Sequence, residues 1–393
     1  MRNRVTASLG VVFVLFSAAA ILLGTSFARR VNSATTDGPV RTYYIAADEV
    51  EWDYTPSGKN VLYNRPFNEM EAEMTVSGPH RIGSKFRKAI YREYMDATFA
   101  QLKPRHSADE YMGLLGPVVH AEVGDTVKVV FRNNASHPYS IHPHGVFYGK
   151  DSEGTAYEDG STAAEKAGGA VAPGTTYTYT WQVPERAGPG PNDPSSVVWL
   201  YHSHVNEQRD VNSGLIGAIV VTRRGSARAD GSPKDVDREL VDLFMIFNEN
   251  DSWYFDRNIQ AHCSDPKGVQ RADLNPMGKE GVFTLIGSGF VDSNIKLSIN
   301  GYLYGNMPMM TMRKGERVRW YLVTLGFAFN FHTPHWHGNV VTVAGQHTDV
   351  VSISPAQMLT ADMRPDDPGT WMFHCHISDH MHGGMATLYQ VTP

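Results

Sequence analysis

The chain has few cysteines, little net charge and no long helical pattern. Only Cys263 and Cys375 occur among 393 residues. If Cys375 binds a metal, Cys263 has no partner within the chain, so an intrachain disulfide is not expected. Cys263 is then interpreted as a free thiol, with an intermolecular link as the alternative. The 35 basic and 41 acidic residues give a formal net charge of −6, which offers no electrostatic case for binding nucleic acid.

The N-terminal residues 1–28 are predicted to be an export signal. Arg2 and Arg4 precede the apolar stretch SLGVVFVLFSAAAILLG, and Ser26-Phe27-Ala28 is a small-x-small cleavage candidate. The apolar run is just shorter than the roughly 18 residues expected of a spanning helix. Retention as an N-terminal membrane anchor is therefore the alternative to cleavage. Either outcome places the protein in the periplasm or outside the cell, and residues 29–40 are interpreted as a flexible lead-in.

From Arg41 onward, short segments rich in Val, Thr and aromatic residues alternate with Gly, Pro, Asn and Asp, which is typical of β-strands. An internal repeat organises these segments. GDTVKVVFRNNASHPYSIHPHG parallels GERVRWYLVTLGFAFNFHTPHWHG, and VVWLYHSHV parallels GTWMFHCHI. We predict an all-β protein of two β-sandwich domains, residues 41–225 and 237–393, joined by a linker at 226–236.

The most informative stretch is WMFHCHISDHMHGGM near the C-terminus. In an extended strand, His374 and His376 share one face and Cys375 points to the other. A thiolate, imidazoles and a thioether are the ligands of a blue-copper electron-transfer site. His380 and Met385 follow Cys375 at short spacing, and His332 is the candidate second imidazole. In the first repeat, Ser203, Tyr139 and Leu215 stand opposite Cys375, His332 and Met385, and only Glu207 or Gln208 lies near the position of His380.

Four His-x-His pairs occur at repeat-related positions, four imidazoles in each predicted domain. They are His142 and His144, His202 and His204, His335 and His337, and His374 and His376. Eight imidazoles are too many for one tetrahedral ion and suit a cluster of about three ions. Imidazole ligation next to a thiolate site favours copper. The methionines of NMPMMTM (residues 306–312) are interpreted as core residues rather than as a relay for cuprous ions.

Taken together, IHPHG, YHSH, HTPHWHG and HCHISDHMHGGM resemble the signature of the multicopper oxidases. Three further stretches are similar to ceruloplasmin, namely YYIAADEVEWDY, GLLGPVVHAEVGD and IHPHGVFYGKDSEG. The length of two domains, with a thiolate site in the second domain only, resembles the two-domain laccases. The resemblance implies two cupredoxin-like Greek-key domains and four copper ions in each chain. The implied type 1 ligands are His332, Cys375, His380 and Met385. The implied type 2 ligands are His142 and His335. The implied type 3 ligands are His144, His202 and His376 on one ion and His204, His337 and His374 on the other.

The resemblance also implies a function and an assembly. We expect a laccase-like oxidase that couples four one-electron oxidations of a phenol-type donor to the reduction of dioxygen to water. Fe(II) or Cu(I) is the alternative donor, and a copper nitrite reductase or an electron carrier is a more distant one. Glu153 is a candidate proton donor, and Asp379 is a candidate for orienting a ligand imidazole. Because ceruloplasmin is a ring of six such domains, the implied assembly is a homotrimer with clusters between subunits.

Overall fold

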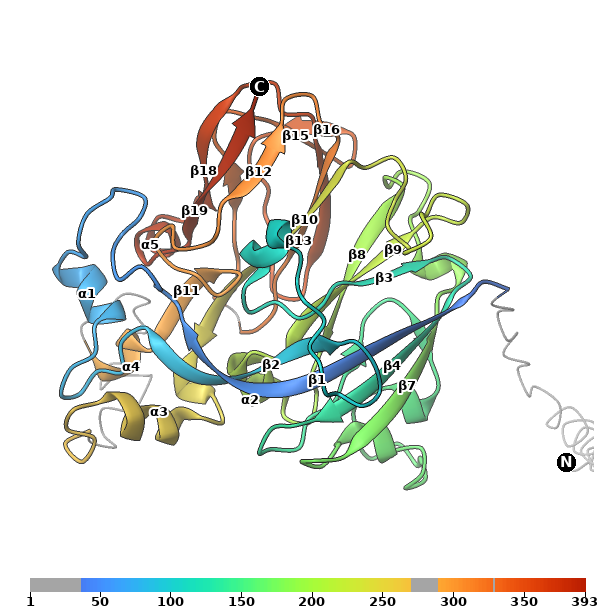
Figure 1. Ribbon diagram of the computed structural model, residues 1–393, viewed down its shortest axis with the longest axis horizontal. Coiled ribbons are helices and arrows are strands. Elements are labelled where there is room, and N and C mark those ends of the chain that lie inside the picture. The colour runs from blue at the N-terminus through green and yellow to red at the C-terminus, as the bar shows by residue number, and fades with distance from the viewer. Residues whose placement is uncertain (1–36, 270–288, 328) are drawn as a thin grey trace, which may run out of the picture. The chain divides into compact units, whose positions relative to one another are not determined.

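A computed structural model describes residues 37–269, 289–327 and 329–393 (Figure 1). The predicted export signal and most of the lead-in lie outside the described residues. Within the described part of the chain, no helix is long and apolar enough to cross a membrane. The secondary structure consists of strands joined by loops and a few short helices, which confirms the predicted all-β fold.

The first half of the chain forms two sheets. The five-stranded sheet has the order β2-β1-β4-β7-β6, with β1 parallel to β4 and antiparallel to β2. The four-stranded sheet has the order β3-β9-β8-β5, with β3 parallel to β9. These strands are β1 (Val40–Asp53), β2 (Lys85–Tyr94), β3 (Val119–Glu122), β4 (Thr126–Asn133), β5 (His142–Pro143), β6 (Phe147–Tyr148), β7 (Thr176–Gln182), β8 (Ser196–His202) and β9 (Ile216–Thr222).

The second half repeats this topology. Its six-stranded sheet has the order β11-β10-β13-β17-β15-β16, and its four-stranded sheet has the order β12-β19-β18-β14. Again β10 is parallel to β13, and β12 is parallel to β19. These strands are β10 (Arg238–Asn248), β11 (Ile295–Ile299), β12 (Met310–Arg313), β13 (Val318–Val323), β14 (Pro334–Trp336), β15 (Val341–Val343), β16 (Gln346–Thr348), β17 (Met358–Met363), β18 (Gly369–Cys375) and β19 (Ala386–Thr392).

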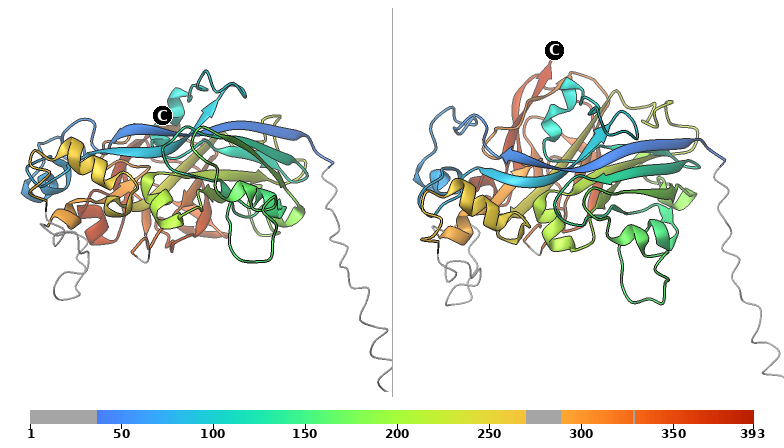
Figure 2. Two further views of the ribbon diagram at one scale, coloured as in Figure 1. Left: turned by 90° about the horizontal axis from the view of Figure 1, so that it is seen from below. Right: turned by 60° about the horizontal axis from the view of Figure 1, so that its bottom comes forward.

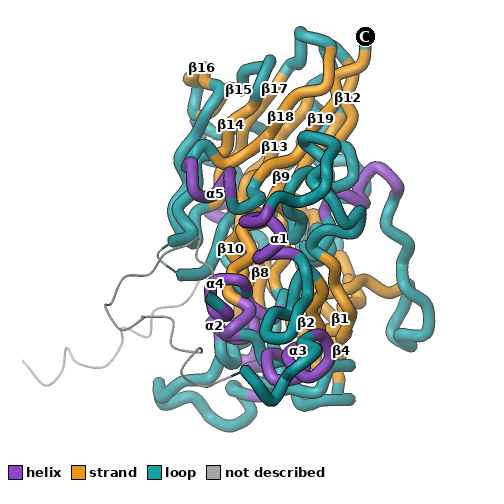
Figure 3. Tube along the Cα trace, turned by 90° about the vertical axis from the view of Figure 1, so that its left-hand side faces the viewer, coloured by secondary structure: helices purple, strands orange, loops and turns teal. Residues whose placement is uncertain are grey.

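The helices are short and lie in the connections, as the tube in Figure 3 shows. They are α1 (Glu69–Thr75), α2 (Glu207–Ser213), α3 (Phe255–His262), α4 (Phe290–Ser293) and α5 (Ser378–His382). Asn68 begins α1 with a capping box, in which its side chain and that of Glu71 bond each other's backbone N–H groups. Helices α2 and α5 occupy equivalent places, each following a strand that ends within a His-x-His pair.

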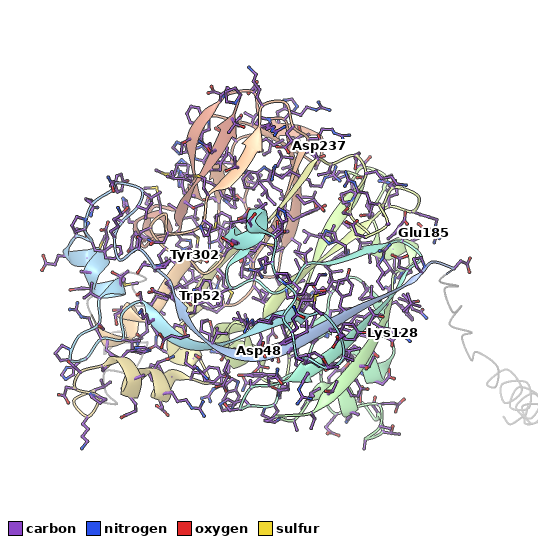
Figure 4. The ribbon with its side chains drawn as sticks, viewed as in Figure 1. Asp48, Trp52, Lys128, Glu185, Asp237 and Tyr302 are labelled. Atoms are coloured by element: carbon purple, nitrogen blue, oxygen red, sulfur yellow. The ribbon has the colours of Figure 1, made fainter. Side chains whose placement is uncertain are left out.

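The two halves share apolar surface. One buried cluster combines first-half residues such as Leu200 and Val220 with second-half residues such as Val241 and Phe247. Strand β1, blue in Figure 2, is a single long strand whose end reaches the second half. There Trp52 lies beside Tyr302 (Figure 4), with ring centroids 5.0 Å apart, and its indole N–H donates to the carbonyl of Gly301 at 2.7 Å. The boundary proposed at 226–236 falls in the loop between β9 and β10, and the division into two domains remains a prediction.

A buried ion pair also joins the halves. Lys88 of β2 binds the carboxylate of Glu249, which follows β10, and both side chains are fully buried. Tyr54 donates a hydrogen bond of 2.5 Å to the same Glu249 oxygen, and the Lys88 ammonium also donates to the carbonyl of Asn212 at 2.8 Å. Burial lowers the pKa of Lys88, and the charge of Glu249 acts in the opposite direction. The pair therefore keeps two charges inside the protein by mutual compensation.

Candidate metal centres

The first centre is a buried group of two imidazoles and a thiol in the second half. Cys375 ends β18, His380 lies on α5, and His332 follows β13 in a loop. Their ligand atoms lie within 4.8 Å of one another, and all three residues are buried. The Nδ1 atoms of His332 and His380 are 3.2 Å apart, and the Cys375 Sγ lies 3.6 Å from His380 Nδ1. The structure thus brings together three of the four residues that the sequence assigns to type 1 copper.

Backbone hydrogen bonds place Met385, the fourth predicted residue, beside this group. Its N–H donates to the carbonyl of His380 at 3.0 Å, and its carbonyl accepts from the N–H of Cys375 at 3.1 Å. The Met385 side chain is fully buried. The N–H of Thr333 points at the Cys375 Sγ at 3.3 Å, so the thiol sulfur already accepts a hydrogen bond that favours its thiolate form.

The electrostatics of this group suit metal binding. Burial lowers the pKa of His332 well below its ordinary value, and the neighbouring His380 lowers it further. Burial also lowers the pKa of His380 to about 4. Both imidazoles are therefore neutral at physiological pH, which is the form that binds metal ions. Burial raises the pKa of Cys375, so the thiolate needs a cation beside it, and a copper ion fits this donor set.

The second group consists of the first-half histidines. His142 on β5 pairs across the sheet with His202 on β8. The Nε2 atoms of His144 and His202 are 3.1 Å apart, and the ring of His204 lies 5.1 Å from that of His142. Burial lowers the pKa of His144 to about 4, and the nearby imidazoles contribute to the shift. Four imidazoles therefore converge at one end of the strands.

The third group is the equivalent in the second half. His335 on β14 pairs with His374 on β18, in the same register as His142 and His202. The Nε2 atom of His374 lies 3.1 Å from the Nε2 of His337 and 3.1 Å from the Nδ1 of His335. The ring of His376 lies 5.0 Å from that of His335. Burial lowers the pKa of His374 to about 4.

The two histidine groups remain separate within the chain. Among the described residues, every contact between two of these eight histidine rings lies within one group or the other, and none joins the groups. Each group holds four imidazoles, whereas the predicted cluster needs eight. The arrangement therefore presents two half-sites.

Backbone carbonyls orient several of these rings. The Nδ1 of His142 lies 2.6 Å from the carbonyl oxygen of Glu153, and the Nδ1 of His374 lies 2.8 Å from that of Cys375. The hydroxyl of Thr155 lies 3.1 Å from the Nδ1 of His204. Such contacts fix the ring and make Nε2 the atom available to a metal ion. The Nε2 of His204 also lies 3.4 Å from a carboxylate oxygen of Glu207. The sequence interpretation missed Thr155, which carries no motif of its own.

Glu153 lies near His142, but its carboxylate is engaged elsewhere. One carboxylate oxygen binds Lys150, and the other accepts a hydrogen bond of 3.0 Å from Tyr157. The contact with His142 is made by the Glu153 backbone oxygen. Asp379 is exposed on α5 next to the buried His380. The proton-donor role of Glu153 and the orienting role of Asp379 remain predictions.

At the position equivalent to the thiolate centre, the first half has a serine hydrogen-bonded to a carboxylate instead of a thiol beside two imidazoles. Ser203 stands in the place of Cys375, and its hydroxyl donates to the buried carboxylate of Asp210 at 2.7 Å. The N–H of Leu215 bonds the carbonyl of Asp210, as that of Met385 bonds His380. The residue opposite His380 is therefore Asp210, and the interpretation of Glu207 or Gln208 as the nearest equivalent was wrong. Counting back from Leu215 instead of forward from Ser203 gives the correct position.

The methionines of the NMPMMTM stretch lie outside the three groups of ligands. Met307, Met310 and Met312 are buried in the core, and Met309 is the one methionine of the NMPMMTM stretch that is exposed. This distribution fits the interpretation of these methionines as core residues.

Comparisons with known proteins agree with this geometry. Multicopper oxidase family models match residues 111–226 and 275–393. The chain is 40% identical to hephaestin of Mus musculus over 365 residues, covering 91% of this chain and 30% of the relative. It is 41% identical to ferroxidase HEPHL1 of Homo sapiens over 354 residues, covering 89% and 29%. It is 38% identical to human ceruloplasmin over 356 residues, covering 89% and 30%. The chain thus spans about 30% of the length of these relatives.

A solved structure shows the same fold. The crystal structure of a multicopper oxidase superimposes with a TM-score of 0.54 at 19% sequence identity, covering 90% of this chain and 89% of the other. The two family models cover both halves, and each half carries one of the histidine groups described above. The chain belongs to the multicopper oxidase family.

Proposed function

We propose that this protein is a copper oxidase that takes electrons one at a time from Fe(II) and passes them to dioxygen. The family uses type 1, type 2 and type 3 copper, which supplies one-electron transfer and the four-electron reduction of dioxygen when bound. The donor sets described above fit that requirement. The observation that carries the choice of Fe(II) is the 41% identity to a ferroxidase over most of the chain.

In this proposal, each group of ligands has a distinct role. His332, Cys375, His380 and Met385 would hold the type 1 ion, and the eight paired histidines would hold the other three. Cys375 lies between His374 and His376 in the chain. Its backbone therefore connects the electron-accepting centre to the histidine group of the second half by a few covalent bonds. Buried surroundings keep water away from the thiolate.

The surface next to His380 suits a cationic donor. Asp379 is exposed and directly precedes the buried His380. Helix α4, which carries the half-buried Asp292, leads into β11, and Leu297 of β11 lies against Gly383 at the end of α5. Carboxylate oxygens are suitable ligands for a hard divalent cation. Electrons from a cation held here would have a short path through His380.

Phenol-type donors, favoured by the sequence interpretation, become the second candidate. Phe331 directly precedes His332 and is 45% exposed. An exposed aromatic ring at this position would stack on an aromatic donor. The two candidates therefore depend on different residues beside the same centre, Asp379 for Fe(II) and Phe331 for a phenol, and one substitution distinguishes them.

We expect Asp379→Asn to weaken Fe(II) oxidation selectively. Removing the carboxylate should raise KM for Fe(II) about tenfold, the ratio that about 1.4 kcal/mol produces. Oxidation of a neutral phenol should change little, because no charge on the donor contacts Asp379. Steady-state kinetics with both donors measure the effect, and Asp256→Asn, an exposed acid on α3, is the control. Equal losses with both donors would contradict a cation-binding role.

We also propose that the complete cluster forms between copies of the chain. This proposal is supported by the separation of the two histidine groups. Val205, which is 37% exposed, follows His204, and Val350, which is 38% exposed, bridges to His335. Apolar side chains beside each half-site suit a subunit contact. The expectation of three copies follows from the resemblance to a ring of six domains. Export also remains a prediction, since it depends on residues 1–28.

A mixing experiment tests the shared cluster. One variant carries His142→Ala and His144→Ala, and the other carries His335→Ala and His337→Ala. Each variant alone should be inactive. Refolded together in equal amounts, they should regain about a quarter of the wild-type activity, because each mixed head-to-tail trimer contains one complete cluster. The measurement is dioxygen uptake alongside native mass spectrometry. Absence of recovery in mixed trimers would place the cluster within one chain.

A further inference from the structure

The first half retains the framework of the thiolate centre without its thiol. The N–H of Ser140 points at the Ser203 hydroxyl at 3.0 Å, as the N–H of Thr333 points at the Cys375 Sγ at 3.3 Å. The N–H of Ser203 bonds the carbonyl of Leu215, as that of Cys375 bonds Met385. Ser203 therefore stands where Cys375 stands in the second half. It lies between His202 and His204, just as Cys375 lies between His374 and His376.

A hydrogen-bonded path leads from the buried Ser203 through Asp210 to the half-buried Trp253. Asp210 is fully buried and accepts the Ser203 hydroxyl at 2.7 Å on one carboxylate oxygen. Its other oxygen accepts the indole N–H of Trp253 at 2.8 Å. Trp253 is half-buried, and the exposed Arg209 lies over its ring at 4.6 Å. The ring of His137 stacks on the same indole at 4.7 Å.

Trp253 differs from the other tryptophans of the chain, all of which the structure describes. Trp52, Trp181, Trp199 and Trp371 donate their indole N–H to backbone carbonyls, and those of Trp320 and Trp336 have no partner. A backbone carbonyl oxygen is too weak a base to accept the N–H proton of an oxidised indole, whereas a carboxylate can accept it. Trp253 is thus the one tryptophan whose oxidation can be coupled to the transfer of its N–H proton to a neighbouring base.

We propose that Trp253, Asp210 and Ser203 form a second electron-uptake path, which delivers electrons from an electron-rich aromatic donor to the first-half histidine group. This inference rests on the copper oxidase function proposed above. The path replaces the lost thiolate centre with an indole that is oxidised and re-reduced in turn. It ends on Ser203, whose backbone leads to His202 on one side and His204 on the other.

The proposed step is balanced. The Trp253 indole loses one electron toward the histidine group and its N–H proton to the carboxylate of Asp210, which leaves a neutral tryptophanyl radical. The final electron acceptor is dioxygen, which the multicopper oxidases reduce to water. A phenol or aryl amine at the exposed edge of the ring then returns one electron, and Asp210 returns the proton. The net result is a donor oxidised by one electron.

Local charge favours the neutral radical. A tryptophan radical cation would lie beside the Arg209 guanidinium and would be repelled by it. Moving the proton to Asp210 leaves no charge on the ring and neutralises a carboxylate that is buried. Burial raises the pKa of Asp210, in keeping with a carboxylate that accepts a proton more readily than an exposed one.

The test uses the copper-loaded Cys375→Ser protein, in which the thiolate centre cannot supply an electron. The protein is reduced without oxygen, mixed with dioxygen and frozen. We expect an electron paramagnetic resonance signal of a tryptophanyl radical, narrowed when the indole rings are deuterated. Adding Trp253→Phe should reduce the signal to background. Adding Trp199→Phe, which removes a half-buried indole that donates to a backbone carbonyl instead of a carboxylate, should leave it unchanged.

A second readout does not depend on trapping a radical. Repeated cycles of reduction and oxygen exposure without a donor should oxidise Trp253 covalently, and peptide mass spectrometry should find that modification at residue 253 above all other tryptophans. A phenol donor should suppress it. A radical that survives Trp253→Phe, or one carried by the adjacent hydrogen-bonded tyrosines Tyr139 and Tyr254, would overturn the proposal. Normal copper content and Fe(II) oxidation in the wild type would at the same time leave the proposed function standing.

Discussion

Replacing Cys375 by serine should remove the visible absorption of the protein and nearly all of its oxidation of Fe(II). Cys375 is the one sulfur ligand of the buried centre that can carry a negative charge, and its backbone is the short link to His374 and His376. A serine hydroxyl does not ionise at neutral pH, so a soft thiolate would be replaced by a weak neutral donor. The rate should fall by more than the roughly 100-fold that loss of an outer partner of a metal ligand causes.

Copper analysis and spectroscopy together decide this prediction. The copper content should fall from about four to about three ions in each chain, following the family pattern of one type 1 site. The eight histidines are unchanged in the variant, so the rest of the copper should remain bound. Cys263→Ser provides the control, because Cys263 is a buried free thiol outside the three groups. Retention of the visible band in Cys375→Ser would contradict the assignment of the thiolate centre.

Breaking the buried ion pair should have the largest effect on stability. We expect Glu249→Gln to lower the free energy of unfolding by about 3–5 kcal/mol, because Lys88 is then left charged or must lose its proton inside the protein. Both side chains are fully buried, and Tyr54 also loses a charged acceptor. Urea unfolding of the copper-free protein measures the loss, so that metal binding does not contribute.

Two further variants show whether the loss of stability comes from the unpaired buried charge. Lys88→Met combined with Glu249→Leu removes both charges and should recover most of the lost stability, since no unpaired charge remains. Glu185→Gln breaks the exposed pair with Arg224 and should change stability far less, because water screens both partners. If Glu249→Gln and Glu185→Gln lowered the free energy of unfolding by equally small amounts, the buried pair would not stabilise the contact between the halves as its position indicates.

The sequence predicted the all-β fold and the grouping of the histidines because both depend on local patterns. Alternation along a strand places His374 and His376 on one face, and the structure brings His374 close to His337 through the pairing of β14 and β18. The repeat then predicts the same arrangement for His142 and His202. Spacing of two residues is enough to encode such a site, which is why the histidine pairs could be grouped without coordinates.

Other features depend on contacts between distant residues, which no short motif records. The bond between Asp210 and Trp253 joins positions 43 residues apart, and the partnership of Lys88 with Glu249 joins positions 161 apart. The sequence offered Glu153 as an acid near the cluster, but Lys150 and Tyr157 engage its carboxylate. The separation of the two histidine groups depends on how the halves meet, which strand patterns do not determine.

The apolar cluster shared by the two halves limits how independently they can vary. Leu200 and Val220 from the first half pack in the same cluster as Val241 and Phe247 from the second. A chain cut in the loop at 226–236 would leave these surfaces facing water, where they would favour aggregation. The two halves are therefore expected to unfold together rather than one after the other. A substitution that disrupts the core of either half should therefore weaken copper binding at all three groups, even where the substituted residue lies far from the ligands.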